Sequence, residues 1–229
     1  MKKSVKSVLP ATEIDMGGFP VKQALPKANF DQIDPFLLVH HGHAKYSDKR
    51  PAKQQGVGPH PPRGFSPVTF VLDGAVHHRD SRGNTQVAKK GEVQWMNAGA
   101  GIIHSERPSE EISKAGERQE IVQTWINTPA EMKMLPPKYY HLSEEVITKF
   151  ESEDGKVKTN LIAGNYNELN GKIPTQSEML VLWSKGEKGG FEKFDISAGY
   201  NTMLYLIKGS ISIKGYGLGD AGEGKNITH

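Results

Sequence analysis

The sequence predicts an all-β protein built from two related β-barrel halves. Its 229 residues include 25 Gly and 14 Pro. The segments between these turn formers are short and rich in β-branched and aromatic residues, which is typical of many short strands. A strand, a glycine turn and a second strand occur around Gly74 and again around Gly209, which indicates that one half repeats the other. The length suits one large domain or two compact ones.

The clearest strands are segments rich in β-branched and aromatic residues that end within a few residues at Gly, Asn or Ser. They span 68–72, 93–96, 121–126, 180–183 and 203–207. Residues 75–85 predict a hairpin, because Gly83 and Asn84 tolerate the positive φ of a tight turn. Residues 143–150 predict a short helix, since Ser143 can cap the first open amides. We therefore expect only one or two short helices.

Prolines mark the boundary between the two halves. Pro129 and the pair at 136–137 suit a linker, because proline lacks an amide donor and fits poorly inside a sheet. The predicted domains are 1–135 and 136–229. Eight of the nine histidines lie in the first 141 residues, so any metal chemistry belongs to the first half.

The composition excludes several classes of protein. The longest apolar runs, 36–39 and 179–183, are far shorter than the ~18 residues of a membrane-spanning helix. No apolar stretch follows the basic N-terminus as it would in a secretory signal. The formal charge of +3 is spread along the chain and forms no surface that would follow a phosphate backbone. We expect a soluble, cytoplasmic protein without a membrane or direct nucleic-acid partner.

A histidine and a glutamate two residues apart are the best candidates for metal ligands. In an extended chain His104 and Glu106 point to one face, and His60 on a neighbouring strand would add a third ligand. The chain has no cysteine, so nitrogen and oxygen must hold any metal. Two imidazoles and a carboxylate suit Fe(II) with open positions, although Mn, Ni, Cu and Zn stay chemically open. The same spacing also occurs by chance in strands without a metal.

His77 and His78 alternate along one predicted strand. At most one of them can point into a barrel interior. We expect one to be exposed and the other to be a hydrogen-bonded part of the wall.

Four motifs resemble the pirin family of the cupin superfamily. They are DPFLL at 34–38, GPH at 58–60 with RGF at 63–65, HRDS at 78–81 with GN at 83–84, and GEVQWMNAG at 91–99 leading into GIIHSE at 101–106. The resemblance extends from about residue 16 to about residue 217. It implies two cupin barrels of the jelly-roll type packed face to face, with one mononuclear metal, usually iron, in the first. It also implies oxygen-dependent cleavage of flavonols such as quercetin in several members, and transcription co-regulation in nuclear ones.

One departure from the family concerns a metal ligand. The family motif His-Pro-His-Arg-Gly-Phe reads HPPRGF at 60–65 here. Pro62 therefore replaces the second histidine of the three-His, one-Glu set that the resemblance implies, and proline has no side-chain donor atom. We expect metal binding to be weak or absent for this reason.

The other ligands implied by the resemblance are present. His60, His104 and Glu106 match family ligands. His41 or His43 could supply a fourth, because the family fold places this segment near the cavity.

A second departure concerns the C-terminal half. Family members continue for several more strands after a segment like 200–217, whereas this sequence turns into the glycine-rich 218–229. The second barrel is therefore expected to be incomplete. Unpaired strand edges recruit other strands, so we expect self-association, a looser second domain or instability.

Two functional hypotheses follow from these observations. The first is a dioxygenase with a mononuclear divalent metal, expected to be Fe(II), that acts on a small aromatic substrate of the quercetin type, with Glu106 as its catalytic residue. The second is a binding or transcription co-regulatory module with a degenerate metal site, which presents a surface to a protein partner. Pro62 and the shortened second half motivate the second hypothesis.

Overall fold

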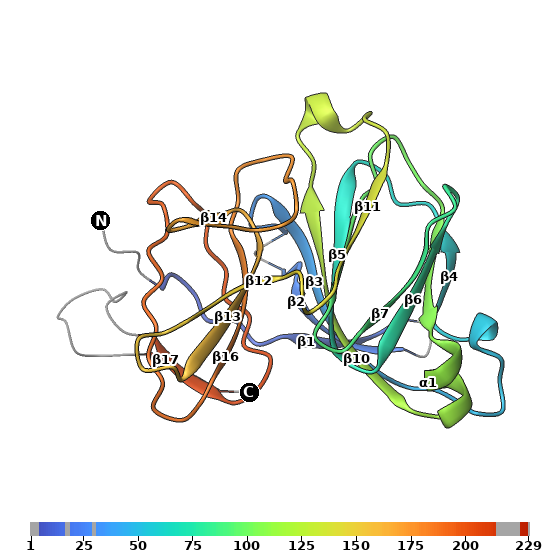
Figure 1. The fold of residues 1–229 in the computed structure, drawn as a ribbon, viewed down its shortest axis with the longest axis horizontal. Helices are drawn as coiled ribbons and strands as arrows, with labels where there is room; N and C mark the ends of the chain where they lie inside the picture. The colour runs from blue at the N-terminus through green and yellow to red at the C-terminus, as the bar shows by residue number, and fades with distance from the viewer. Residues whose placement is uncertain (1–4, 17–18, 29–30, 214–224, 229) are drawn as a thin grey trace.

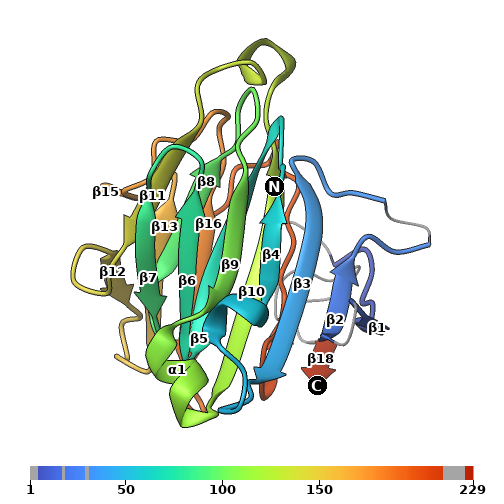
Figure 2. The same cartoon turned by 90° about the vertical axis from the view of Figure 1, so that its right-hand side faces the viewer.

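The computed structural model describes residues 5–16, 19–28, 31–213 and 225–228, the last of these by backbone alone. The first half is a sandwich of two antiparallel sheets (Figure 2). The seven-stranded sheet has the order β1 (Thr12–Asp15), β2 (Pro20–Leu25), β3 (Phe36–Lys45), β10 (Arg118–Asn127), β5 (Phe65–Asp73), β8 (Val93–Asn97) and β11 (Lys138–Leu142). The four-stranded sheet has the order β4 (Val57–His60), β9 (His104–Pro108), β6 (Ala75–Asp80) and β7 (Thr85–Lys89). The seven-stranded sheet extends beyond the predicted boundary at residue 135, because β11 pairs with β8.

The second half forms a smaller lobe beside the first (Figure 1). Its sheet contains β12 (Thr148–Glu151), β13 (Val157–Ala163) and β16 (Val181–Gly186). Two ribbons accompany it: β14 (Asn165–Tyr166) with β15 (Leu169–Asn170), and β17 (Ser210–Ile213) with β18 (Lys225–Thr228). Residues 187–209 contain no strand. The fold is all-β and of the cupin type, as the sequence predicts.

Most of the predicted strands are confirmed. The apolar runs from 68 to 183 lie in β5, β8, β10 and β16, and the predicted hairpin is formed by β6 and β7. The strand predicted at 203–207 is wrong. Met203, Tyr205 and Ile207 instead pack against a cluster of Leu25, Val39 and Val122. This segment partly buries these side chains by covering the face of a sheet, without forming a strand.

The helix predicted at 143–150 is also wrong. The Ser143 carbonyl accepts from the Val146 amide (3.1 Å) and closes a turn, after which β12 pairs with β13. Strand pairing therefore overrides local helix propensity here. The α-helix is α1 (Glu110–Ala115), which Ser109 caps by accepting from the Ile112 amide at 3.2 Å. Two 3₁₀ turns, η1 (Ala52–Gln54) and η2 (Ala130–Met132), complete the helical structure of the described residues.

The main hydrophobic core joins the two halves. Its buried members include Val68, Val93, Trp95, Ile126 and Leu142 from the seven-stranded sheet, and Ile162, Ala163, Met179 and Val181 from the second half. Side chains alternate along a strand, so the opposite face of the large sheet turns toward the four-stranded sheet. On β5, Val68 belongs to the joint core, whereas Thr69 contacts Glu106 of β9.

The described helices include none long and apolar enough to cross a membrane.

Candidate metal site

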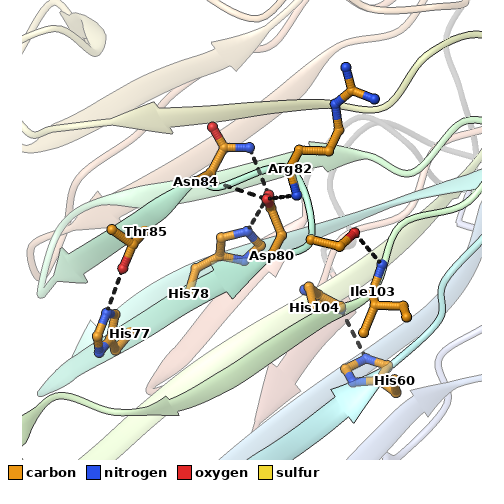
Figure 3. Close-up of polar contacts among 10 residues, drawn as sticks. His60, His77, His78, Asp80, Arg82, Asn84, Thr85, Ile103 and His104 are labelled. Carbon is orange, nitrogen blue, oxygen red and sulfur yellow. Dashed lines mark hydrogen bonds and ion pairs between the residues drawn. The ribbon is translucent and has the colours of Figure 1, made fainter.

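Two predicted ligands meet between neighbouring strands of the four-stranded sheet. His60 at the end of β4 is directly opposite His104 at the start of β9. Their Nε2 atoms lie 2.9 Å apart, and Figure 3 shows the two rings approaching each other. Two ligands of one metal ion with bonds of ~2.0–2.1 Å stand ~2.9 Å apart at a right angle and ~3.4 Å apart at the tetrahedral angle. The pair of imidazoles therefore fits a shared metal ion.

The environment of His60 fixes which of its nitrogens is free. His60 Nδ1 lies 2.9 Å from the carbonyl oxygen of Gly58. A carbonyl only accepts, so Nδ1 carries the proton. With its proton on Nδ1, His60 presents the Nε2 lone pair toward His104, and His104 Nε2–H can donate to it. A metal-binding histidine commonly shows this arrangement, with its second nitrogen donating to a backbone carbonyl.

His104 is a neutral, buried imidazole. Its exposed fraction is 3%, and its Nδ1 has no hydrogen-bond partner among the described residues. Burial lowers the pKa of His104 to about 4, although the neighbouring Glu106 carboxylate opposes this shift. The ring is therefore unprotonated near neutral pH, which is the form that binds a metal.

Glu106 is held by donors from the seven-stranded sheet. Its Oε1 accepts from Thr69 Oγ1 at 3.0 Å, and its Oε2 accepts from Gln123 Nε2 at 2.8 Å. A carboxylate keeps further lone pairs, and ligating carboxylates are commonly oriented by such bonds. The ligand atoms of His60, His104 and Glu106 do not, however, all lie within 4.8 Å of one another. The structure thus brings the two histidines together and holds the carboxylate on the same face of β9.

Pro62 lies where the cavity meets this site. It is buried, and it lines a cavity of about 150 Å³ together with His60 and His104. Phe65 and Trp125 stack in the wall of the same cavity with their ring centroids 4.4 Å apart. A second, more open cavity of about 470 Å³ shares Pro61 and Pro62 with the first. The site therefore opens onto an apolar surface.

His41 and His43 are not brought to this cavity. They lie on β3 beside Glu120 of β10, and His41 Nε2 is 2.8 Å from Glu120 Oε1. Glu120 and Gln123 are three positions apart on one strand and point to opposite faces. Gln123 contacts Glu106 in the space between the two sheets. Glu120, His41 and His43 therefore lie on the opposite face of the seven-stranded sheet, which we call its outer face.

His78 is the hydrogen-bonded wall residue of the pair at 77–78. His78 is buried beside His104, stacks on Tyr139 (centroids 4.2 Å apart) and lies 3.0 Å from Asp80. Asp80 also accepts from the hairpin amides, as Figure 3 shows. His77 is half-buried and contacts Thr85, so the two histidines alternate as predicted.

The sequence analysis missed the residues that hold Glu106. Thr69 and Gln123 each interrupt an apolar strand with a polar side chain. That pattern was the available signal, because a buried polar residue needs a hydrogen-bond partner. The partner that Thr69 or Gln123 contacts depends on how the two sheets pack against each other.

Comparison with known proteins places the chain in a family. The model of the family described as Pirin matches residues 18–126. A Pseudomonas aeruginosa protein with the provisional name quercetin 2,3-dioxygenase is 36% identical over 198 residues, which are 86% of this chain and 68% of the relative. The chain belongs to the pirin family. Human pirin is 32% identical over 93% of this pirin-family chain and 69% of its own length.

A solved structure resembles this member of the pirin family in fold as well. The crystal structure of a quercetin 2,3-dioxygenase from Acinetobacter baumannii superposes with a TM-score of 0.70 at 35% identity. The match covers 80% of this chain and 64% of that chain. This pirin-family chain thus spans slightly less than two thirds of the solved protein.

Proposed function

We propose that this pirin-family protein is a mononuclear-metal dioxygenase that acts on flavonol-type substrates. The observation that carries the proposal is the pair of Nε2 atoms of His60 and His104, 2.9 Å apart at the wall of an apolar cavity. The resemblance to proteins named quercetin 2,3-dioxygenase supports the substrate class.

His60, His104 and Glu106 would hold the metal, which we expect to be Fe(II) because two imidazoles and a carboxylate suit it. When bound, iron supplies the redox chemistry of oxygen-dependent cleavage. Glu106, oriented by Thr69 and Gln123, would accept the proton of a substrate hydroxyl, as a positioned carboxylate can.

The shape of the cavities favours a flat aromatic substrate that is only partly enclosed. The inner cavity of about 150 Å³ is smaller than the ~300–1,000 Å³ that commonly encloses a drug-sized ligand. One ring would lie against Phe65 and Trp125. The rest would occupy the outer cavity past Pro61 and Pro62.

The test is oxygen uptake by protein loaded anaerobically with Fe(II) and then given quercetin in air. We expect uptake by the parent protein and by His77→Ala, whose histidine contacts Thr85 outside the cavity. We expect its loss in His104→Ala and Glu106→Gln. A loaded parent protein that consumes no oxygen would overturn the proposal.

Pro62 favours a second candidate, a non-catalytic binding module of the pirin fold. Its ring forms part of the cavity wall but offers no ligand atom. Such a module would bind an aromatic compound or a protein partner without turnover. Quercetin binding measured by fluorescence, without oxygen uptake in the iron-loaded protein, would distinguish this candidate from the enzyme.

A further inference from the structure

Three metal-binding side chains converge on the outer face of the seven-stranded sheet, away from the cavity. Glu120 of β10 is directly opposite His43 of β3, and His41 follows on the same face. Glu120 Oε1 lies 2.8 Å from His41 Nε2 and 3.8 Å from His43 Nε2. One ligand atom from each residue lies within 4.8 Å of the other two. Ligand atoms around a tetrahedral metal stand about 3.4 Å apart, so these positions are close to a coordination shell.

The ring of His41 is fixed with one nitrogen toward this group. Its exposed fraction is 3%, and its Nδ1 lies 3.0 Å from the Tyr205 hydroxyl. The phenol ring meets the imidazole edge to face, with centroids 5.8 Å apart. In the structure the Glu120 carboxylate accepts from His41 Nε2–H, so the Tyr205 hydroxyl donates to Nδ1. When a metal takes the place of the Nε2 proton, Nδ1 carries the proton instead and the Tyr205 hydroxyl accepts from it. Bonds of this kind orient metal-binding histidines in general.

The other two side chains give access from solvent. The His43 side chain is 50% exposed and that of Glu120 is 32% exposed. A modest rotation of His43 would bring its Nε2 nearer to the other two ligand atoms. Lys22 of β2 pairs with His41 in the strand register. The positive charge of Lys22 repels a cation at this site, whereas the Glu120 carboxylate attracts one. Two imidazoles and one carboxylate, with an open side, form a set that binds Zn²⁺ with water as the fourth ligand.

We propose that His41, His43 and Glu120 form a second binding site for a divalent transition metal such as Zn²⁺, separate from the cavity site. Tyr205 acts as a positioning residue through His41. Because Tyr205 belongs to the strandless segment that covers the sheet, a bound metal would also fasten this segment to β3.

The test is the Zn²⁺ stoichiometry of the full chain, measured by competition with a coloured chelator. To remove the contribution of the cavity site, all measurements are made in a His104→Ala background. There we expect the protein to retain one Zn²⁺ per chain and to lose it with either His43→Ala or Glu120→Gln. The matched control is His77→Ala, a half-buried histidine on β6 that contacts Thr85, and it should keep the Zn²⁺.

Both variants are expected to fold normally, because the His43 side chain is at the surface and Glu120→Gln preserves the shape of the side chain. Zinc stoichiometry that is equal in the background and in both variants would overturn the proposal, as would a background that binds no zinc.

Tyr205→Phe tests the positioning role. It should keep the stoichiometry but weaken Zn²⁺ binding ~10–100-fold, as the loss of an orienting hydrogen bond does elsewhere. Unchanged affinity would exclude Tyr205 from the site. None of these outcomes depends on whether the cavity site is catalytic.

Discussion

Protonation of His104 links the stability of the first barrel to pH. Burial lowers the pKa of His104 to about 4, against ~6.5 for an unperturbed histidine. Between these values the unfolded chain carries a proton on this residue that the folded chain lacks. Stability therefore rises with pH across this window and falls as the medium becomes acidic.

We predict that the metal-free protein loses about 2 kcal/mol of unfolding free energy through His104 alone between pH 7 and pH 5. Urea unfolding at the two pH values measures the loss. His104→Gln removes this titration, so its stability should depend less on pH than that of the parent. Equal pH dependence in both proteins would show that His104 titrates normally in the fold.

Pro62 provides the second prediction at this scale. Pro62→His adds an imidazole to the wall that His60 and His104 share, so we expect metal binding to tighten at least tenfold, or ~1.4 kcal/mol. Equilibrium dialysis with Fe(II) under nitrogen measures the change. The backbone contact of residue 62, whose carbonyl accepts from the Ile102 amide, is unaffected by the substitution. Unchanged affinity would mean that a side chain at 62 does not reach the metal.

The sequence predicted the local arrangement of His104 and Glu106 better than the contacts that hold them. Alternation along a strand predicted one face for both residues, and the structure places them two positions apart in β9. The bonds from Thr69 and Gln123 join two sheets. Such contacts depend on how the sheets pack, which a local pattern does not encode.

At the scale of elements, the loop that leads from β8 to His104 depends on Gly99. Its φ is +53°, and a Cβ added there would lie 2.1 Å from the carbonyl oxygen of Leu135. Gly83 in the β6–β7 hairpin also has a positive φ, of +88°, but nothing lies within 4 Å of its added Cβ. Substitution of Gly83 by alanine therefore measures the free-energy cost of the backbone conformation alone, whereas substitution of Gly99 measures that cost together with the cost of a steric clash.

We predict that Gly83→Ala costs about 1 kcal/mol, the usual price of a left-handed alanine. Gly99→Ala should cost at least ~2 kcal/mol more, because the backbone must move away from Leu135. Urea unfolding of the two variants at one pH measures the difference. Equal costs would show that the loop absorbs the extra methyl group without strain.

Strands were easier to predict than the other elements. Runs such as 121–126 are apolar, bounded and long enough to specify β10. The helix at 143–150 was wrong because its residues are recruited into pairing with β13. The actual helix α1 begins after Ser109, a cap of the kind that the sequence analysis assigned to Ser143. A cap alone does not decide between two short segments when packing favours one of them.

At the scale of the whole molecule, the described residues of the two halves differ in how they are arranged in sheets. The first half has two sheets that face each other, whereas the second has a three-stranded sheet, short ribbons and the strandless stretch 187–209. Lys188 and Lys208 are exposed and lie in this strandless stretch. Segments outside regular sheets commonly open at a lower free energy than core strands do.

We predict that limited trypsin digestion cleaves beyond Lys172 before it cleaves the first barrel. Mass spectrometry of the fragments and light scattering of the intact protein provide the measurement. We also expect self-association through the edges of the small sheet, because open edges pair with other strands. A monomer whose C-terminal third resists trypsin as well as its first barrel would contradict both expectations.

Strand β10 is shared by both sites, since Gln123 faces the cavity and Glu120 faces His41. Deleting Ile121 or Val122, which lie between these two positions, would leave Glu120 and Gln123 themselves in the sequence. It would nevertheless turn one of the two side chains to the opposite face, because a strand repeats every second residue. Evolution can therefore substitute residues along β10 one at a time, but an insertion or deletion in its middle would disrupt one or both sites in a single step.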